Sequence, residues 1–232
     1  MRNFRHWTAA LLMLASPAVA EDPGPVVVEL YTSQGCSSCP PADAYFLELA
    51  RQEGIVALAM HVDYWDYIGW KDSFADPDYT ARQKSYAAAQ GKQMVYTPQM
   101  IVDGTYDVAG TKPDAVATAI AKHRAEPNPV ALKLRREGGS LHITATPRGA
   151  VPGRMDVTLL RYQPKATVAI KSGENAGRTL SYANIVTSME ALGTWTGETP
   201  LRLTQPIKGD SPVTVLIQQS GHGPITAAAK LE

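Results

Sequence analysis

Residues 26–50 constrain the fold of this chain most, because an apolar run, two cysteines, two prolines and a helical pattern follow one another there. Residues 26–31, VVVELY, are apolar except for one acid, which is typical of a buried parallel strand. Cys36 and Cys39 come next and are the only cysteines among the 232 residues. The prolines then open a predicted helix over residues 40–52, since proline suits the first helical turn. The stretch predicts strand, loop and helix, with both cysteines at the helix N-terminus.

A cysteine in this position has a defined chemistry. The helix dipole and free backbone N–H groups stabilise a thiolate and make its sulfur a nucleophile. We expect Cys36 to be the exposed attacking cysteine and the more buried Cys39 to resolve a mixed disulfide. A residue before proline avoids the helical region, so Cys39 is expected to cap the helix. Proline has no N–H, so the sequence does not predict a very low thiol pKa.

Glu29 is the acid inside the first apolar run, where a charge is costly to bury. We expect it to point toward the underside of the two cysteines, where its carboxylate would accept the proton of Cys39. The alternative is that Glu29 faces a solvated edge or caps a backbone group.

Residues 25–125 alternate between strand-like and helix-like patterns. Asp76-Pro77 signals a helix start and Asp103-Gly104 signals a hairpin. The order β-α-β-α-β-β-α predicts an α/β fold of thioredoxin-like type, with a central mixed sheet flanked by helices. The elements after the first strand and helix are expected at residues 55–62 (strand), 76–90 (helix), 99–102 and 105–108 (strands) and 113–124 (helix).

The pattern changes at residues 126–130, EPNPV, which have the composition of a linker. Beyond them, short segments alternate apolar and polar residues between turn-forming residues, so a small antiparallel β-sandwich is expected. The predicted domains are therefore residues 21–126 and 127–232. The expected strands of the second domain lie within residues 130–136, 140–147, 154–162, 166–171, 200–207 and 212–219.

Residues 1–20 have a basic start, a short apolar stretch and a small-x-small ending, and predict a secretory signal peptide cut after Ala20. The apolar stretch is too short to span a bilayer. We therefore expect a periplasmic or secreted protein in an oxidising compartment, where the two cysteines would rest as a disulfide. The formal net charge of zero does not favour nucleic acid or an acidic membrane surface as a partner.

Residues 25–125 resemble thioredoxin-like proteins in VVVELYTSQGCSSC, TPQMIVDG and the closing helix. The chain after the signal peptide is similar to domain-of-unknown-function family 1223, on ELYTSQGCSSCPPAD, HVDYWDYIGWKDSFADPDYTARQKSYA and VYTPQMIVDG. The resemblance implies a thioredoxin-like fold and a redox function without an established substrate. It also implies that Thr97-Pro98 is a cis peptide facing the cysteines, beside which a substrate strand binds; the alternative is an ordinary trans proline at a strand start. The Ser-Ser pair between the cysteines differs from ordinary thioredoxins and leaves the direction of electron flow open.

The aromatic insertion, residues 61–74, begins where the second predicted strand ends. Because strand carboxyl ends face the ligand crevice of such sheets, its side chains are expected to share a cleft with Cys36. The alternative is that the aromatic residues form a small core under a long loop. The candidate substrate-binding residues are Thr97, Pro98, His61, Asp63, Trp65, Asp66, Trp70 and Arg82.

The function predicted first is thiol–disulfide exchange through Cys36 with a protein thiol or disulfide, without a cofactor. In a second hypothesis Cys36, Cys39 and His61 bind Cu(I) or Zn(II). A third is a non-catalytic thioredoxin-like scaffold with a permanent disulfide, which binds partners through its β-rich half.

Overall fold

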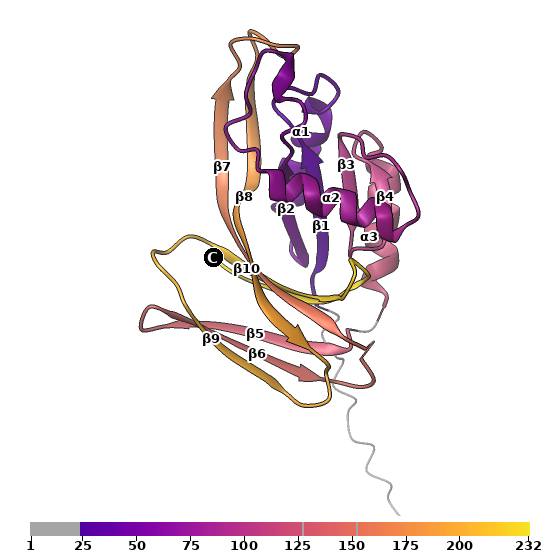
Figure 1. The fold of residues 1–232 in the computed structure, drawn as a ribbon, viewed down its shortest axis with the longest axis vertical. Coiled ribbons are helices and arrows are strands. Elements are labelled where there is room, and N and C mark those ends of the chain that lie inside the picture. Colours follow the sequence, from indigo (N-terminus) through magenta and orange to yellow (C-terminus); the bar gives the residue numbers. More distant parts are fainter. Residues whose placement is uncertain (1–23, 127, 152) are drawn as a thin grey trace, which may run out of the picture.

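The structure is a computed structural model and describes residues 24–126, 128–151 and 153–232. The predicted signal peptide, with its cut after Ala20, lies outside the described residues. The fold is mixed α/β, with a large mixed sheet flanked by helices and a separate small antiparallel sheet (Figure 1). This confirms the mixed α/β class expected from the alternating patterns.

The described chain contains β1 (Val26–Thr32), α1 (Pro40–Leu49), β2 (Ile55–His61), a 3-10 turn η1 (Asp66–Ile68), α2 (Pro77–Ala89), β3 (Gln99–Val102), β4 (Tyr106–Ala109), α3 (Pro113–Arg124), β5 (Val130–Glu137), β6 (Ser140–Pro147), β7 (Met155–Ala169), β8 (Thr179–Trp195), β9 (Leu201–Pro206), β10 (Val213–Gln219) and β11 (Ile225–Leu231).

The first half of the chain matches the sequence prediction closely. Asp76 caps α2 by accepting a hydrogen bond from the Asp78 backbone N–H, and Pro77 occupies the first turn. Asp103 and Gly104 have positive φ angles of 45° and 71° and connect β3 to β4. Helix α1 ends at Leu49, whereas its predicted end was residue 52. Local capping and turn signals thus determined most of these boundaries.

The large sheet has the strand order β11-β10-β7-β8-β2-β1-β3-β4. Strand β1 pairs in parallel with β2 and antiparallel with β3. Strand β8 from the second half lies parallel to β2, with Ala59 opposite Ile185. The two halves of the chain therefore contribute strands to one continuous sheet.

The second half differs from the separate β-sandwich that we expected. Only β5, β6 and β9 form the small sheet, while β7, β8, β10 and β11 extend the large one. The two segments predicted at residues 154–162 and 166–171 are one strand, β7, which continues through Pro164. Strands β8 and β11 were not predicted, because Ala, Asn and Gly weaken the β-propensity of β8 and three consecutive alanines weaken that of β11.

Each face of the large sheet is covered by different elements. Helices α1 and α3 pack on one face of β1 through a core that includes Leu30, Phe46 and Ile120. Helix α2 covers the opposite face, where Tyr86 packs among the side chains of Val27 and Tyr31. A third core fills the space between the small sheet and the strands β7, β10 and β11. Alternate residues of β1 therefore point toward α1 or toward α2.

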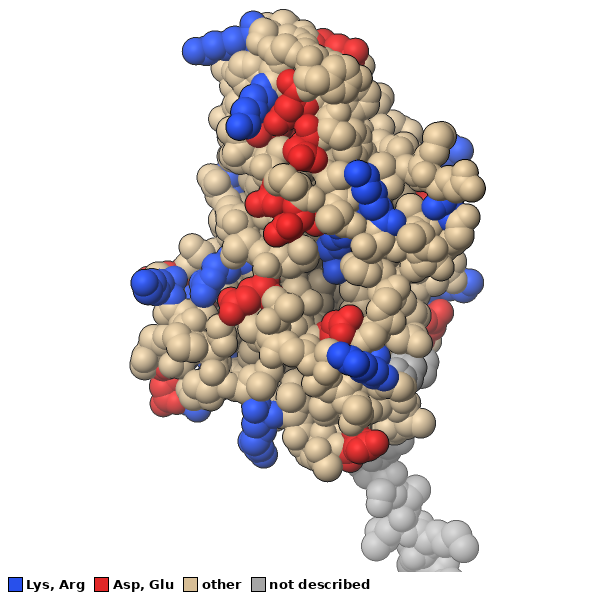
Figure 2. Space-filling model, viewed as in Figure 1, with Lys and Arg blue, Asp and Glu red and all other residues tan. Residues whose placement is uncertain are grey.

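Charged side chains are distributed without a field of one sign on the face shown in Figure 2, where basic and acidic groups lie among uncharged ones. This agrees with the formal net charge of zero. Within the described ranges, none of the helices combines the length and apolar character needed to cross a bilayer.

Candidate functional site

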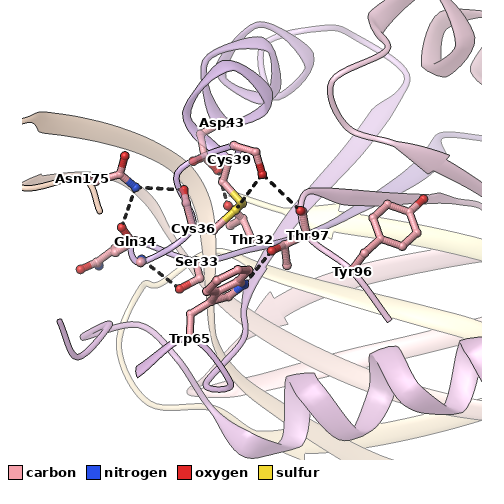
Figure 3. The surroundings of a disulfide bond; sticks show 12 residues. Thr32, Ser33, Gln34, Cys36, Cys39, Asp43, Trp65, Tyr96, Thr97 and Asn175 are labelled. Atoms are coloured by element: carbon pink, nitrogen blue, oxygen red, sulfur yellow. Dashed lines mark hydrogen bonds between the residues drawn. A yellow bond between two sulfur atoms is a disulfide. The ribbon is translucent and has the colours of Figure 1, made fainter. Parts of the chain in front are cut away.

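Cys36 and Cys39 form a disulfide at the start of α1, with their Cα atoms 5.4 Å apart (Figure 3). Cys39 is the N-cap residue and Pro40 is the first residue of the helix, as the sequence predicted. The reason given for that prediction is wrong, because the Cys39 backbone lies in the helical region (φ −76°, ψ −35°) and its side chain makes no capping hydrogen bond. The backbone N–H groups of Ala42 and Asp43 both donate to the Cys39 carbonyl oxygen, at 2.9 and 3.0 Å. Because Pro40 and Pro41 have no N–H, these are the first N–H groups of the helix, and both bond to the backbone.

Both cysteines are fully buried, with 0% of each residue exposed. The expectation of an exposed Cys36 is therefore wrong. Ser37 and Ser38, between the two cysteines, are exposed instead. We call residues 33–39 the CxxC loop. Three segments contact it: the one that contains Thr97 and Pro98, the aromatic insertion, and a hairpin from the second half of the chain.

The Thr97–Pro98 peptide is cis, which confirms that prediction. Ser38 connects it to the disulfide, because its Oγ lies 3.4 Å from the Cys36 Sγ and donates to the Thr97 carbonyl oxygen at 3.5 Å. Tyr96, just before this peptide, is 40% exposed. The peptide and the CxxC loop therefore adjoin, as Figure 3 shows.

The aromatic insertion lies against the CxxC loop. Trp65 donates from Nε1 to the Thr97 Oγ1 at 2.8 Å, and Trp70 donates from Nε1 to the Gln34 Oε1 at 2.8 Å. Gly35 leaves room for this packing, since a Cβ there would lie in tight contact, 3.2 Å from both the Trp65 Cβ and the Ile68 side chain. Trp65 and Trp70 therefore lie against the Thr97–Pro98 peptide and the CxxC loop, while Tyr64 and Trp65 also pack against the core under α2.

His61 and Asp72, near the two ends of the insertion, make a buried pair in which His61 Nδ1 and Asp72 Oδ2 are 2.7 Å apart. Asp72 Oδ2 also accepts the Gln34 backbone N–H at 2.8 Å, which connects the pair to the CxxC loop. Asp66 Oδ1 accepts the Asp72 backbone N–H at 3.0 Å, so Asp66 orders the insertion. Asp63 lies farther along, where its Oδ1 accepts the Thr80 hydroxyl of α2 at 2.6 Å.

Asp43, one turn into α1, is the acid that the structure places with Cys39. Its Oδ1 accepts the Thr32 hydroxyl at 2.7 Å, and the residue is only 4% exposed. Burial raises the pKa of Asp43 from 3.8 to about 7, against the lowering effects of His61 and the Thr32 hydrogen bond. A carboxyl with such a pKa exchanges protons near neutral pH.

Glu29 points away from this site, so its predicted orientation is wrong. It shares the side of β1 with Val27 and Tyr31, facing α2, whereas α1 packs on the other side. Arg82 binds it with Nε at 2.7 Å and Nη2 at 3.2 Å, and the Tyr86 hydroxyl donates to it at 2.5 Å. Glu29 and Arg82 therefore form a buried ion pair between β1 and α2, and neither lines the disulfide.

The structure thus brings Thr97, Pro98, Trp65 and Trp70 to the CxxC loop, while His61 and Asp66 reach that loop through Asp72. The sequence prediction gave no catalytic or binding role to three residues here: Asp43, Asp72 and Asn175. Asp43 had a signal, since its position four residues after Cys39 puts both on one helix face. Nothing in the local sequence indicated Asn175, which reaches the loop from the β-rich half.

A metal site has no geometric support in the described ranges, where no three His, Cys, Asp or Glu side chains lie close enough to hold an ion. The Nδ1 atom of His61 already faces Asp72.

The comparisons with known proteins agree with this architecture. The family model described as a protein of unknown function, DUF1223, matches residues 27–218, and the chain belongs to this family. The chain is similar to the crystal structure of protein AGR_C_4864 from Agrobacterium tumefaciens, with 32% sequence identity and a TM-score of 0.78. The match covers 91% of this chain and 96% of that one.

A second structure, HBP35 of Porphyromonas gingivalis, has a TM-score of 0.62 at 14% identity, covering 91% of this chain and 76% of that chain. That likeness concerns the fold alone. No curated protein matches the chain.

Proposed function

We propose that this protein carries out dithiol–disulfide exchange through Cys36 and Cys39, in a thioredoxin-like arrangement within the first half of the chain. One observation carries the proposal: the Cys36–Cys39 disulfide spans the start of α1 directly beside the Thr97–Pro98 peptide. A disulfide at a helix N-terminus has a leaving thiolate close to the positive end of the helix dipole.

The exchange needs a partner of one chemical class, a protein dithiol. A thiolate of the partner attacks the Cys36 Sγ and forms a mixed disulfide, while the bond to Cys39 breaks and Cys39 leaves as a thiolate. The second thiolate of the partner then attacks its own mixed-disulfide sulfur and releases Cys36. The partner loses two electrons and two protons and becomes a disulfide, while Cys36 and Cys39 become thiols. With a disulfide partner the same steps run in reverse.

Asp43 is the residue that we assign to the proton of Cys39. Asp43 follows Cys39 by one helical turn, and its carboxyl is buried with a pKa of about 7 and has one oxygen, Oδ2, without a hydrogen-bond partner in the described part of the chain. The protonated carboxyl supplies a proton to the leaving thiolate, and the carboxylate takes it back when Cys39 attacks as a thiolate. This role replaces the one first expected of Glu29.

A cell-envelope location is part of the proposal and rests on the signal-peptide pattern of residues 1–20. An oxidising compartment keeps such a disulfide closed between turnovers.

Trapping of mixed disulfides tests the exchange. Cys39→Ser leaves Cys36 able to attack a partner but removes the resolving sulfur, so covalent adducts are expected in the envelope fraction after acid quenching. The matched control is Cys36→Ser, which should trap few or none. Adducts at equal levels in both variants, or in neither, would contradict the proposed exchange.

The burial of both cysteines favours a second candidate, a scaffold with a structural disulfide. The reduction potential separates the two, because structural disulfides typically lie below about −300 mV. A higher potential together with adducts supports exchange, whereas a lower potential without adducts supports the scaffold.

A further inference from the structure

The tip of the β7–β8 hairpin, residues 170–178, reaches from the second half of the chain to the disulfide. Figure 1 shows β7 and β8 rising together alongside the helices of the first half. The hairpin tip contacts the CxxC loop at the Cys36 carbonyl oxygen and the aromatic insertion at the Gly69 carbonyl oxygen, and Cys36 itself is fully buried.

Asn175 makes the contact with the CxxC loop. It is only 1% exposed, and its Nδ2 donates to the carbonyl oxygens of Gln34 at 3.0 Å and Cys36 at 2.9 Å (Figure 3). Its Oδ1 accepts a hydrogen bond from Arg178 Nη1 at 3.0 Å. Each polar atom of this buried amide is therefore engaged, and both of its donors hold the backbone that carries Cys36.

Ser172 and Gly173 make the contact with the insertion. The Ser172 hydroxyl donates to the Gly69 carbonyl oxygen at 2.6 Å. Gly173 has a φ of 76°, and a Cβ there would lie 3.1 Å from the Trp70 Cβ. Close approach of the two backbones therefore requires glycine at this position.

The hairpin tip also holds itself together. The Ile170 N–H donates to the Arg178 carbonyl oxygen at 2.8 Å, and the Gly177 N–H donates to the Ile170 carbonyl oxygen at 2.9 Å. These bonds lie within the tip and stay intact when it moves as a unit, whereas lifting it breaks the contacts made by Ser172, Gly173 and Asn175.

We propose that the hairpin tip is a gate over the disulfide, with Asn175 as the positioning residue that holds it closed. Opening breaks the two Asn175 hydrogen bonds and admits a partner thiolate to the Cys36 Sγ. The gate rests on the proposed exchange function and adds its control: the β-rich half determines when the sulfur can be reached.

The rate of disulfide reduction by a small phosphine, tris(2-carboxyethyl)phosphine, tests the gate without a protein partner. Asn175→Asp preserves the size of the side chain but replaces the donor nitrogen by an acceptor oxygen that repels both carbonyl groups. Reduction is expected to be on the order of tenfold faster or more, since two buried hydrogen bonds no longer oppose opening. Gly173→Ala, which disturbs the other contact, is expected to accelerate reduction as well.

The matched control is Thr167→Ala, which removes a hydroxyl contact with Ser181 lower on the same hairpin, at 3.0 Å. Its reduction rate is expected to equal that of the wild type. Urea unfolding of every oxidised variant distinguishes local opening from global loss of stability, because a gate changes the rate without a matching change in the unfolding midpoint. Unchanged rates in both Asn175→Asp and Gly173→Ala would overturn the gate.

The two proposals fail separately. Faster phosphine reduction without mixed-disulfide adducts supports the gate and rejects the exchange with proteins. Adducts with unchanged phosphine rates do the opposite.

Discussion

Replacing Asp43 by asparagine is expected to change how the stability of the oxidised protein depends on pH. The folded protein raises the pKa of Asp43 from 3.8 to about 7 through burial, while the unfolded chain returns it to its ordinary value. Between these two pH values the folded state keeps a proton that the unfolded state has released. The free energy of unfolding therefore falls as the pH rises through this window, and stays lowered above it.

The magnitude follows from the distance between the two pKa values. At about 1.4 kcal/mol for each pH unit, this carboxyl lowers wild-type stability by roughly 3 to 4 kcal/mol between pH 4 and pH 8. Asparagine keeps the shape and an oxygen for the Thr32 hydroxyl, but it does not ionise. Relative to wild type, Asp43→Asn is therefore expected to gain this amount over the same interval.

Urea unfolding of the oxidised proteins at pH 4, 6 and 8, without reductant, measures the difference. Asp63→Asn serves as the matched control, since Asp63 also accepts a threonine hydroxyl but is only partly buried. A constant stability difference between wild type and Asp43→Asn at all three pH values would refute the reasoning. It would also remove Asp43 as the proton carrier for Cys39.

Further predictions concern the packing around the site. Arg82→Leu leaves Glu29 buried without its ion-pair partner and is expected to lower the unfolding free energy by roughly 3 to 5 kcal/mol. The double variant Glu29→Leu/Arg82→Leu should recover part of that loss, and fully additive effects in urea unfolding would contradict this. Phe46→Ala, in the core between α1 and β1, is expected to lower the unfolding free energy by roughly 3 to 5 kcal/mol. Tyr67→Ala, at a side chain that is 81% exposed, should change it by no more than about 0.5 kcal/mol, and equal thermal unfolding midpoints of the two variants would argue against this core. Trp65→Phe keeps an aromatic ring but loses the hydrogen bond to Thr97, and it is expected to speed phosphine reduction of the disulfide. An unchanged rate would mean that this bond does not limit access to the disulfide.

The fold of the first half was predictable because its signals are local. The apolar runs of β1 and β2, the Asp76-Pro77 helix start and the Asp103-Gly104 turn each specify a few neighbouring residues. Strand β8 carries no such pattern, since its apolar residues alternate only in part and it gains its place by pairing with β7 and β2. Its position depends on contacts distant in sequence, which the pattern of one segment does not encode.

The candidate site was predictable in its chemistry but not in its exposure. The cysteine spacing and the proline helix start placed the disulfide at the N-terminus of α1. The direction of Glu29 depended on which face of β1 receives α1, and strand alternation alone leaves that choice open. Cys36 is buried among segments distant in sequence, and Asn175, which bonds its carbonyl oxygen, lies 139 positions away in the chain. Long-range packing therefore decided the features that the sequence left open.

The single Ala59–Ile185 pairing between β2 and β8 has a consequence for biosynthesis. All seven residues of β2 are buried, yet the strand that covers its outer edge is made more than a hundred positions later. While only the first half of the chain has been synthesised, the edge of β2 is unpaired and apolar, and such an edge can pair with other chains. We expect truncated products that stop before β8 to aggregate, so the nascent protein needs a chaperone or rapid completion to remain monomeric.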